Sequence, residues 1–414
     1  MTDASNFDAI IIGAGPAGLC LAIGLVRYGY RIGLIERQSE RAIAEPGFDG
    51  REIALTHRSI HILRGLGVWP RIAPHEIAPL KRAAVMTGRS AHHLLFDQRD
   101  TKCAALGYLV PNHLIRKAAF EALAAQTGVS FLPDRQLIGL ETGADAVTVR
   151  TAQGETLRGR WLIVADGRFS ETRRALGIAA DMLDFGKSML VCRMRHRASH
   201  AETAREWFKD QSTLALLPLN GTESSVVVTA SAAQTQRLQS MDPAGFNREL
   251  EGRWEGVLGS MELSSTRHVY PLVATYSRRF ADRRCALIGD SAVGMHPVTA
   301  HGFNLGLQSG SSLLRELQCA SPLLSRYEAI HRRIARPMYL ATNAIVRLYT
   351  DTRPAAQVLR MAGLHLANRL RPFKKIVLSS LTEFDPSYGA DAMHTIPDGL
   401  NAYEIKPTVH QPLR

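Results

Sequence analysis

Residues 7–18 decide the fold of this chain, and they read Phe7-Asp8-Ala9-Ile10-Ile11-Ile12-Gly13-Ala14-Gly15-Pro16-Ala17-Gly18. A short apolar run rich in isoleucine is typical of a buried parallel strand. It leads directly into glycines at G-x-G-x-x-G spacing. We expect an amphipathic helix over 16–28, ended by Gly29, and a second strand over 31–36 that ends on Glu36. This order of elements predicts a dinucleotide-binding βαβ unit.

Each part of this unit has a physical role. Gly13 permits the tight turn from strand to helix, Gly15 lets the backbone approach a pyrophosphate, and Gly18 lets helix and strand pack closely. The helix N-terminus offers N–H groups and partial positive charge to phosphates, and Glu36 can accept hydrogen bonds from a ribose hydroxyl. The unit does not by itself separate NAD from FAD. The residues expected to hold the ADP half are Gly13, Ala14, Gly15, Pro16, Ala17, Gly18, Glu36 and Arg37.

Composition limits the protein class. The chain has 414 residues, 45% hydrophobic and 21% charged, which is typical of a globular protein of about two domains with an appendage. Its five cysteines are scattered and lack C-x-x-C spacing, so we expect a cytoplasmic protein with neither disulfides nor a zinc site. The net charge of +12 is spread along the chain without interleaved aromatic residues, which disfavours nucleic acid as a partner. The sequence has no run of about 18 apolar residues that could span a membrane.

Two later motifs extend the pattern. A hairpin is expected over 146–151 and 156–164, and its second strand leads into Asp166-Gly167. Another buried strand starts at residue 285 and ends in Gly289-Asp290, and a helix is expected to begin near Gly302.

With these three motifs in this order, the chain resembles the flavin-dependent aromatic hydroxylases, the family of para-hydroxybenzoate hydroxylase. The resemblance implies an α/β fold: a Rossmann-like FAD-binding domain, an inserted β-sheet substrate domain and a C-terminal helical region. It also implies that Asp290 contacts the ribitol and pyrophosphate, and that Asp166 and Gly167 serve FAD and the pyridine nucleotide. The other residues that it assigns to FAD are Arg51, Arg116, Gly302, Phe303 and Asn304.

Finer features resemble the ubiquinone-biosynthesis hydroxylases of this family, of the demethoxyubiquinol hydroxylase type. They include residues 49–55, 106–112 and 214–219. The resemblance implies an enzyme in which NAD(P)H reduces FAD, oxygen forms a flavin hydroperoxide, and the aromatic ring of a prenylated phenol or quinol is hydroxylated. Two alternatives stay open: a hydroxylase of a soluble phenolic or polyketide, and a non-catalytic flavin-containing protein that docks on a membrane or nucleic acid.

The region after Asp290 departs from the family pattern. The usual histidine is replaced by Val293, and the usual Gly-Gln-Gly reads Ala300-His301-Gly302. His296 and His301 could form a proton relay beside the flavin, but two polar residues that fill a loop are the more ordinary interpretation. Pro297 resembles the proline that lines the pocket above the flavin. No protein nucleophile is assigned.

The expected domains are discontinuous. Segments 1–74, 103–180 and 270–345 would form the FAD-binding domain, segments 75–102 and 181–269 the substrate domain, and 346–414 a C-terminal helical region and tail. Strand-like runs at 188–195, 214–219 and 224–230 predict a sheet in the second insert. Residues 346–380 are strongly basic, and a helix is expected over 355–371. This segment either rests on the inner face of an anionic membrane or packs on the FAD-binding domain. A quinone-biosynthesis complex is the other expected partner of the protein.

Overall fold

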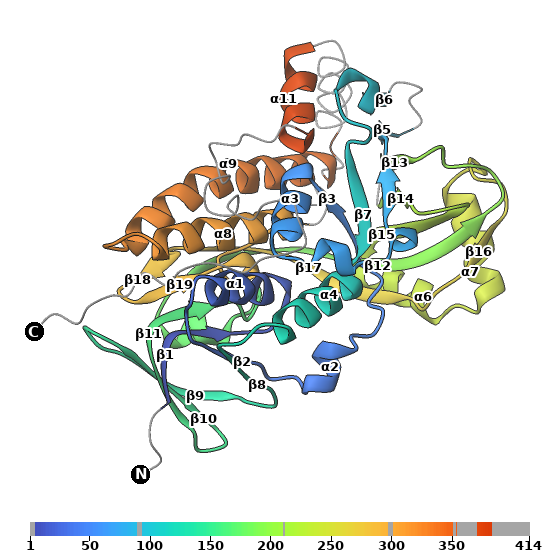
Figure 1. The fold of residues 1–414 in the computed structure, drawn as a ribbon. Helices are drawn as coiled ribbons and strands as arrows, with labels where there is room; N and C mark the ends of the chain where they lie inside the picture. Colours follow the sequence, from blue (N-terminus) through green and yellow to red (C-terminus); the bar gives the residue numbers. More distant parts are fainter. Residues whose placement is uncertain are drawn as a thin grey trace, which may run out of the picture.

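The structure is a computed structural model, and it describes residues 5–88, 93–209, 212–296, 301–350, 353 and 371–382. Two large sheets organise it, one at each end of the molecule, with helices packed between and beside them (Figure 1). This arrangement confirms the expected fold: an α/β dinucleotide-binding unit, a second sheet and helices at the C-terminal side.

The first sheet has eight described strands, in the order β18-β19-β11-β1-β2-β8, with β10 and β9 extending from β11. Strands β19, β11, β1, β2 and β8 run parallel. Their bounds are β1 Ser5–Ile12, β2 Ile32–Ile35, β8 Val129–Leu132, β9 Leu137–Thr142, β10 Val147–Thr151, β11 Thr156–Val164, β18 Ala281–Asp282 and β19 Cys285–Leu287.

Helices cover this sheet and bury its isoleucine-rich strands. Helix α1 spans Pro16–Arg27 and contacts α4, Asn112–Ala124, and α8, Gly302–Leu317. The apolar run predicted to be a buried strand is fully enclosed: Ile10 and Ile11 are completely buried in the largest hydrophobic cluster. Burial on both faces explains why residues 9–12 of β1 are continuously apolar rather than alternating.

The second sheet has nine described strands, in the order β20-β17-β12-β15-β14-β13-β5-β6, with β16 paired to β12. It confirms the sheet expected from the runs at 188–195, 214–219 and 224–230. Strand β17 remains in this sheet through Ser277, past the expected return to the FAD-binding domain at residue 270. The bounds are β5 Arg82–Thr87, β6 His93–Asp97, β12 Ala180–His196, β13 Thr203–Phe208, β14 Thr213–Pro218, β15 Glu223–Ser231, β16 Met261–Leu263, β17 His268–Ser277 and β20 Val293–Gly294.

Side chains of the second sheet alternate between two environments. One face packs against α6, Ala232–Ser240, and α7, Pro243–Arg253, and forms a separate hydrophobic cluster. The members of that cluster on the central strands include Leu190, Cys192, Leu214, Leu216, Val226 and Val228. The residues between them point to the opposite face, toward the first sheet, because side chains of a strand alternate with a period of two.

A small three-stranded sheet joins the two halves. It consists of β3 Glu52–Leu55, β7 Gly107–Pro111 and β4 Ala78–Leu80. Asn304 fastens the start of α8 to this sheet: its amide donates to the Ala54 carbonyl at 2.8 Å and accepts from the Thr56 N–H at 3.1 Å. The remaining short elements are α2 Glu40–Ala44, α3 His57–Gly65, α5 Glu171–Ala175, and the 3₁₀ turns Trp69–Arg71, Pro74–Glu76, Gln98–Asp100 and Gly289–Ser291.

The C-terminal side is helical. Helix α9 spans Leu324–Thr350 and contacts α8, and α11 spans Arg371–Thr382. Leu378 of α11 is buried against Leu94 and Phe96 of β6, where Figure 1 shows the two elements close together. The helix expected over 355–371 lies almost entirely outside the described residues. In the described part of the chain, no helix has the length and apolar character needed to span a membrane.

Candidate active site

The three sequence motifs meet at one edge of the first sheet. Ile12, Val164 and Leu287 are register partners at the carboxyl ends of the parallel strands β1, β11 and β19. The residues that follow each strand therefore lie side by side. Ligands of open α/β sheets bind at this edge, so the register alone gathers Gly13, Asp166 and Asp290 in one place.

The glycines of the β1–α1 turn differ in what surrounds them. Gly13 has φ +106°, and a Cβ there would meet the Ala165 carbonyl oxygen at 2.6 Å. At Gly18 a Cβ would lie 2.1 Å from the Gly13 oxygen, so helix and strand touch at this point. Around Gly15 no atom of the described structure lies within 4 Å of such a Cβ. Gly13 and Gly18 are thus closed by the protein's own backbone, whereas Gly15 faces open space.

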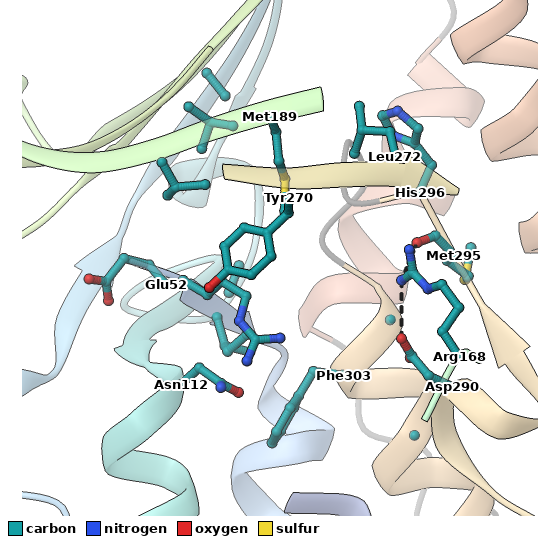
Figure 2. A pocket seen from close by; sticks show the side chains of 18 of the residues that line it. Glu52, Asn112, Arg168, Met189, Tyr270, Leu272, Asp290, Met295, His296 and Phe303 are labelled. Carbon is teal, nitrogen blue, oxygen red and sulfur yellow. Dashed lines mark hydrogen bonds and ion pairs between the residues drawn. The ribbon is translucent and has the colours of Figure 1, made fainter. Parts of the chain in front are cut away.

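A cavity of about 580 Å³ lies in front of Gly15 and continues to the second sheet. In Figure 2, Asn112, Arg168, Tyr270, Asp290 and Phe303 surround it from different elements. Ligand pockets commonly have this size and lie between domains. The sequence-predicted residues that line the cavity are Gly15, Pro16, Ala17, Arg51, Gly167, Asp290, His296, Gly302 and Phe303.

Other predicted residues lie near this cavity without lining it. Gly13 and Gly18 pack against backbone, and the Asn304 side chain is held by β3 and Thr56. Arg37 is exposed and forms a 4.0 Å ion pair with Glu171. Pro297 lies outside the described residues. The predicted residues that are absent from the cavity lining are Gly13, Ala14, Gly18, Glu36, Arg37, Arg116, Asp166, His301 and Asn304.

Glu36 and Arg116 form a second group beyond the glycine turn. The Glu36 carboxylate accepts the Ala14 N–H at 2.6 Å and the Gln38 N–H at 2.9 Å. Arg116 donates to the Gln38 side chain. Burial lowers the pKa of Arg116, and the nearby Glu36 only partly offsets that shift. The Arg116 Nε is buried without a hydrogen-bond partner among the described residues.

Arg168 links the second and third motifs. Its Nη2 donates to an Asp290 oxygen and to the Met295 carbonyl, each at 3.1 Å, and its Nη1 donates to the Val273 carbonyl at 2.5 Å. Figure 2 marks the pair with Asp290 by a dashed line. Gly294 makes room for this arginine, since a Cβ there would lie 2.6 Å from Arg168 Nε. One side chain therefore connects the first sheet to β17 and β20 of the second.

Arg51 belongs to a second bridging group. Its Nε and Nη2 both donate to Asp49 Oδ2, at 3.0 and 2.6 Å, and the same oxygen accepts from the Asn112 amide at 2.8 Å. These contacts lower the pKa of Asp49 in spite of its burial, chiefly through Arg51. The Tyr270 hydroxyl of β17 donates to the Asp49 carbonyl at 2.7 Å, and its ring lies 5.6 Å from the Arg51 guanidinium. Arg51 is thus held at the cavity wall by groups from three elements.

Comparison with known proteins identifies the family. Residues 6–340 match the family described as FAD binding domain. The chain is 42% identical to the ubiquinone hydroxylase UbiM of Neisseria meningitidis, over 91% of this chain and 84% of that protein. It is 30% identical to the ubiquinone hydroxylase UbiL of Rhodospirillum rubrum, over 90% of this chain and 88% of that one.

The chain belongs to this family of FAD-dependent monooxygenases. The match confirms the resemblance read from the sequence, together with FAD as cofactor and NAD(P)H as the family's reductant. Among solved structures, p-nitrophenol 4-monooxygenase PnpA from Pseudomonas putida has the same fold, with a TM-score of 0.74 and 17% identity over 91% of this chain and 98% of that one.

The residues present fit an FAD. The N-termini of α1 and α8 both border the cavity, and neither has a side-chain cap hydrogen bond within the described structure. Their N–H groups are therefore available to anionic or electron-rich atoms. Around both Gly15 and Gly302 a Cβ would meet no described atom within 4 Å. Asp166 accepts the Thr172 N–H through one oxygen, while its other oxygen is buried without a partner among the described residues.

The two histidines occupy different positions. His296 is buried, lines the cavity and stacks edge-on against Phe185 at 4.8 Å. Burial lowers its pKa to about 4, with further lowering by the positive charges of Arg168 and Lys187. His296 is therefore a neutral imidazole near pH 7. His301 is the N-cap residue of α8 and does not line the cavity.

Several functional residues were not found by sequence reasoning. Arg168 follows Asp166-Gly167 directly, and its place after a strand's carboxyl end was a usable signal. Tyr270 and the cavity-facing side chains of the second sheet gave no such signal, because they lie on separate strands and form one surface only after those strands pair.

Proposed function

We propose that this monooxygenase hydroxylates the aromatic ring of a ubiquinone precursor, a prenylated phenol or quinol, with FAD, NAD(P)H and oxygen. The named activities of the relatives from Neisseria meningitidis, Rhodospirillum rubrum and Escherichia coli, the last a 3-demethoxyubiquinol 3-hydroxylase, support this substrate class. The structural observation that carries the proposal is the continuous cavity that runs from the N-terminus of α1 to the face of the second sheet. It would place a flavin and an apolar ring in one enclosure.

The residues predicted from the sequence would hold the cofactor along this path. The α1 N-terminus behind Gly15 would take the pyrophosphate, Glu36 the adenosine ribose, and Asp290 the ribitol. Arg116 would brace the adenosine side, where its buried Nε lacks a partner among the described residues. Asp166, in the second motif, would contact the cofactor at the same edge of the first sheet. FAD, once bound, supplies oxygen activation at the expense of NAD(P)H.

The chain's own contribution is charge, position and exclusion of water. The α8 N-terminus at Gly302-Phe303 and the Arg51 guanidinium both border the cavity and favour negative charge there. A helix N-terminus stabilises such charge by about 0.3–2 kcal/mol. Side chains such as Phe185, Met189 and Leu272 give the substrate side apolar walls, which keep water from the reacting atoms. Since His296 is neutral, it adds no positive charge to this site near pH 7.

A peripheral membrane contact at an inner membrane face, or docking to a quinone-biosynthesis complex, is part of the proposal. Support comes from the basic segment 346–380. In its described part, Lys375 of α11 is exposed while Leu378 packs on β6. Liposome flotation tests the membrane contact: the intact protein should float with anionic vesicles, and a variant with reversed charges at residues 369–375 should not. Equal flotation of the two proteins overturns the contact.

Complementation tests the reaction. An Escherichia coli strain that lacks 3-demethoxyubiquinol 3-hydroxylase should regain ubiquinone when it expresses this protein, and its lipid extract should lose the accumulated precursor. A Gly15→Val variant, whose side chain would extend into the pyrophosphate site, is the matched inactive control. If the purified, flavin-loaded enzyme consumes oxygen with soluble phenols while the strain still accumulates precursor, the substrate is a soluble phenol and the proposal is wrong.

A further inference from the structure

The cavity face of the second sheet is built from two rows of side chains in register. One row crosses five strands through Tyr270, Met189, Thr229, Thr213 and Phe208, each a backbone partner of the next. All five line the cavity. The row starts beside Arg51 and ends at Phe208, whose ring lies 4.0 Å from that of Tyr349 at the end of α9.

The second row runs parallel to the first and ends on an acid. It consists of Val191, Val227, Ala215 and Glu206, which are partners across β12, β15, β14 and β13 and all line the cavity. Val191 lies against the turn at Gly50, next to Arg51. Three strand spacings of about 4.8 Å separate its ends by roughly 14 Å. A substituted aromatic ring can lie over this row between the Arg51 turn and Glu206.

Glu206 is the polar exception in this row. Its carboxyl group has no hydrogen bond or ion pair with any described residue. Its backbone partners are Ala215 on β14 and Val85 on β5, neither of which can hydrogen-bond through its side chain. Glu206 is half-buried in an apolar wall, where a polar group is more stable when a partner hydrogen-bonds to it. Ala215, with only a methyl group, leaves space in front of Glu206 for a ligand to do so.

Neighbouring charges do not account for the raised pKa of Glu206. The neighbouring strands carry Arg205 on β13 and Arg82 on β5, Lys187 of β12 lines the same cavity, and none of these charges shifts the pKa of Glu206. Burial alone raises the pKa of Glu206 to about 8. Near pH 7 it is mainly an uncharged carboxylic acid, which can both donate and accept a hydrogen bond, as a glutamine side chain can.

We propose that Glu206 is a specificity-determining residue that hydrogen-bonds an oxygen substituent of the substrate's aromatic ring and so orients that ring over the Val227–Ala215 row. This inference rests on the proposed function, since it takes the ligand to be an oxygen-bearing ring with an apolar chain. Glu206 touches the substrate but takes no part in redox chemistry.

A binding cycle tests the contact on the FAD-loaded enzyme without NAD(P)H. The two probes are 2-farnesylphenol and farnesylbenzene, which differ only in the ring hydroxyl, and binding is followed by flavin fluorescence. The wild type should prefer the phenol about tenfold, the usual worth of one hydrogen bond in an apolar site. Glu206→Leu should reduce this preference to near onefold, and Glu206→Gln should keep most of it. Glu262→Leu, the same change at an exposed acid on β16 of this sheet, should behave as the wild type.

The outcomes distinguish a failure of the Glu206 contact from a failure of the proposed substrate class. If Glu206→Leu retains the preference, or weakens both probes equally, Glu206 does not bind the ring oxygen and only this inference fails. If neither probe binds the wild type, the proposed substrate class fails and the inference fails with it. Thermal unfolding tests whether Glu206 has a structural role. Glu206→Leu should melt no lower than the wild type, because the substitution removes a half-buried carboxyl group that has no partner among the described residues. A lower melting temperature would show that the carboxyl group supports the fold.

Discussion

The two ends of the cavity are built in opposite ways. At the nucleotide end, the residues of one turn form the site. Backbone atoms lie within 3 Å of a Cβ placed at Gly13 or Gly18, whereas Gly15 faces the open cavity. At the substrate end, the wall consists of side chains from five strands, spread between residues 185 and 272. Ligand binding at the nucleotide end depends on the conformation of the backbone, whereas at the substrate end it depends on which side chains are present.

This difference explains why one end is shared across a family and the other can vary. A pyrophosphate site made of main-chain N–H groups tolerates only glycine at the points of close approach. A sheet face can exchange individual side chains without disturbing the strands that carry them, provided that the opposite face keeps its core. Substitutions at the two ends should therefore differ in their effects on folding and on ligand binding.

The glycine turn should show the largest effects. Gly18→Ala places a Cβ 2.1 Å from the Gly13 oxygen, so we expect a loss of about 3 kcal/mol in folding stability. Gly15→Ala meets no described atom within 4 Å and should fold normally, yet bind FAD at least tenfold more weakly. Thermal unfolding of the apoprotein and the flavin absorbance of purified protein measure the two effects. Gly252→Ala, in a similarly open place on α7, is the control: it should leave FAD binding unchanged and should not lower stability, because alanine favours a helix more than glycine does. Equal stability of the two turn variants would contradict the contrast.

Substitution of Arg168 should have the next largest effect, because this side chain connects the nucleotide end of the cavity to the second sheet. Arg168→Gln loses donors to Asp290, Val273 and Met295, and we expect about 2 kcal/mol of lost stability together with weaker FAD binding. Chemical denaturation and FAD titration measure both. Arg174→Gln, at an exposed arginine six residues away in sequence, should have no effect. An Arg168 variant that matches this control would show that the two sheets are held together without it.

Glu206, at the substrate end, should make the stability of the protein depend on pH. The folded-state pKa of Glu206, about 8, lies above its ordinary value of 4.5. Between these values the folded protein keeps a proton that the unfolded chain releases, so this residue lowers stability progressively as pH rises from about 5 to 8. Glu206→Gln removes the effect. The melting temperature of the variant relative to the wild type should therefore increase over that range. A difference independent of pH would mean that Glu206 is ionised at neutral pH.

His296 should produce the smallest change. With a pKa lowered to about 4, it gains no proton between about pH 5 and 8. His296→Gln should therefore leave the shape of the pH–rate profile of hydroxylation unaltered, although the rate itself can shift through lost packing on Phe185. Loss of a titration near pH 6.5 in the variant would support the proton relay that the sequence left open.

Much of the nucleotide end was predictable because its signals are local. The strand over residues 7–12, the glycine spacing and the acidic end at Glu36 lie within 30 consecutive residues. The second sheet was predictable only as strands. Nothing in the runs at 188–195 or 224–230 says which residues become neighbours, because β12 and β15 are not consecutive and the register between such strands depends on turns and core packing. Glu206 and Tyr270 escaped sequence reasoning for this reason.

The sequence alone determined the class of protein, its FAD and the order of its motifs, because glycine spacing and strand ends are set by backbone sterics within each segment. The tertiary structure decided which side chains share one enclosure. Pairing placed Val191, Val227, Ala215 and Glu206 in a single row, and Arg168 tied that sheet to Asp290. Such contacts arise between residues far apart in the chain, whose distance is fixed only when hydrophobic burial closes the whole core.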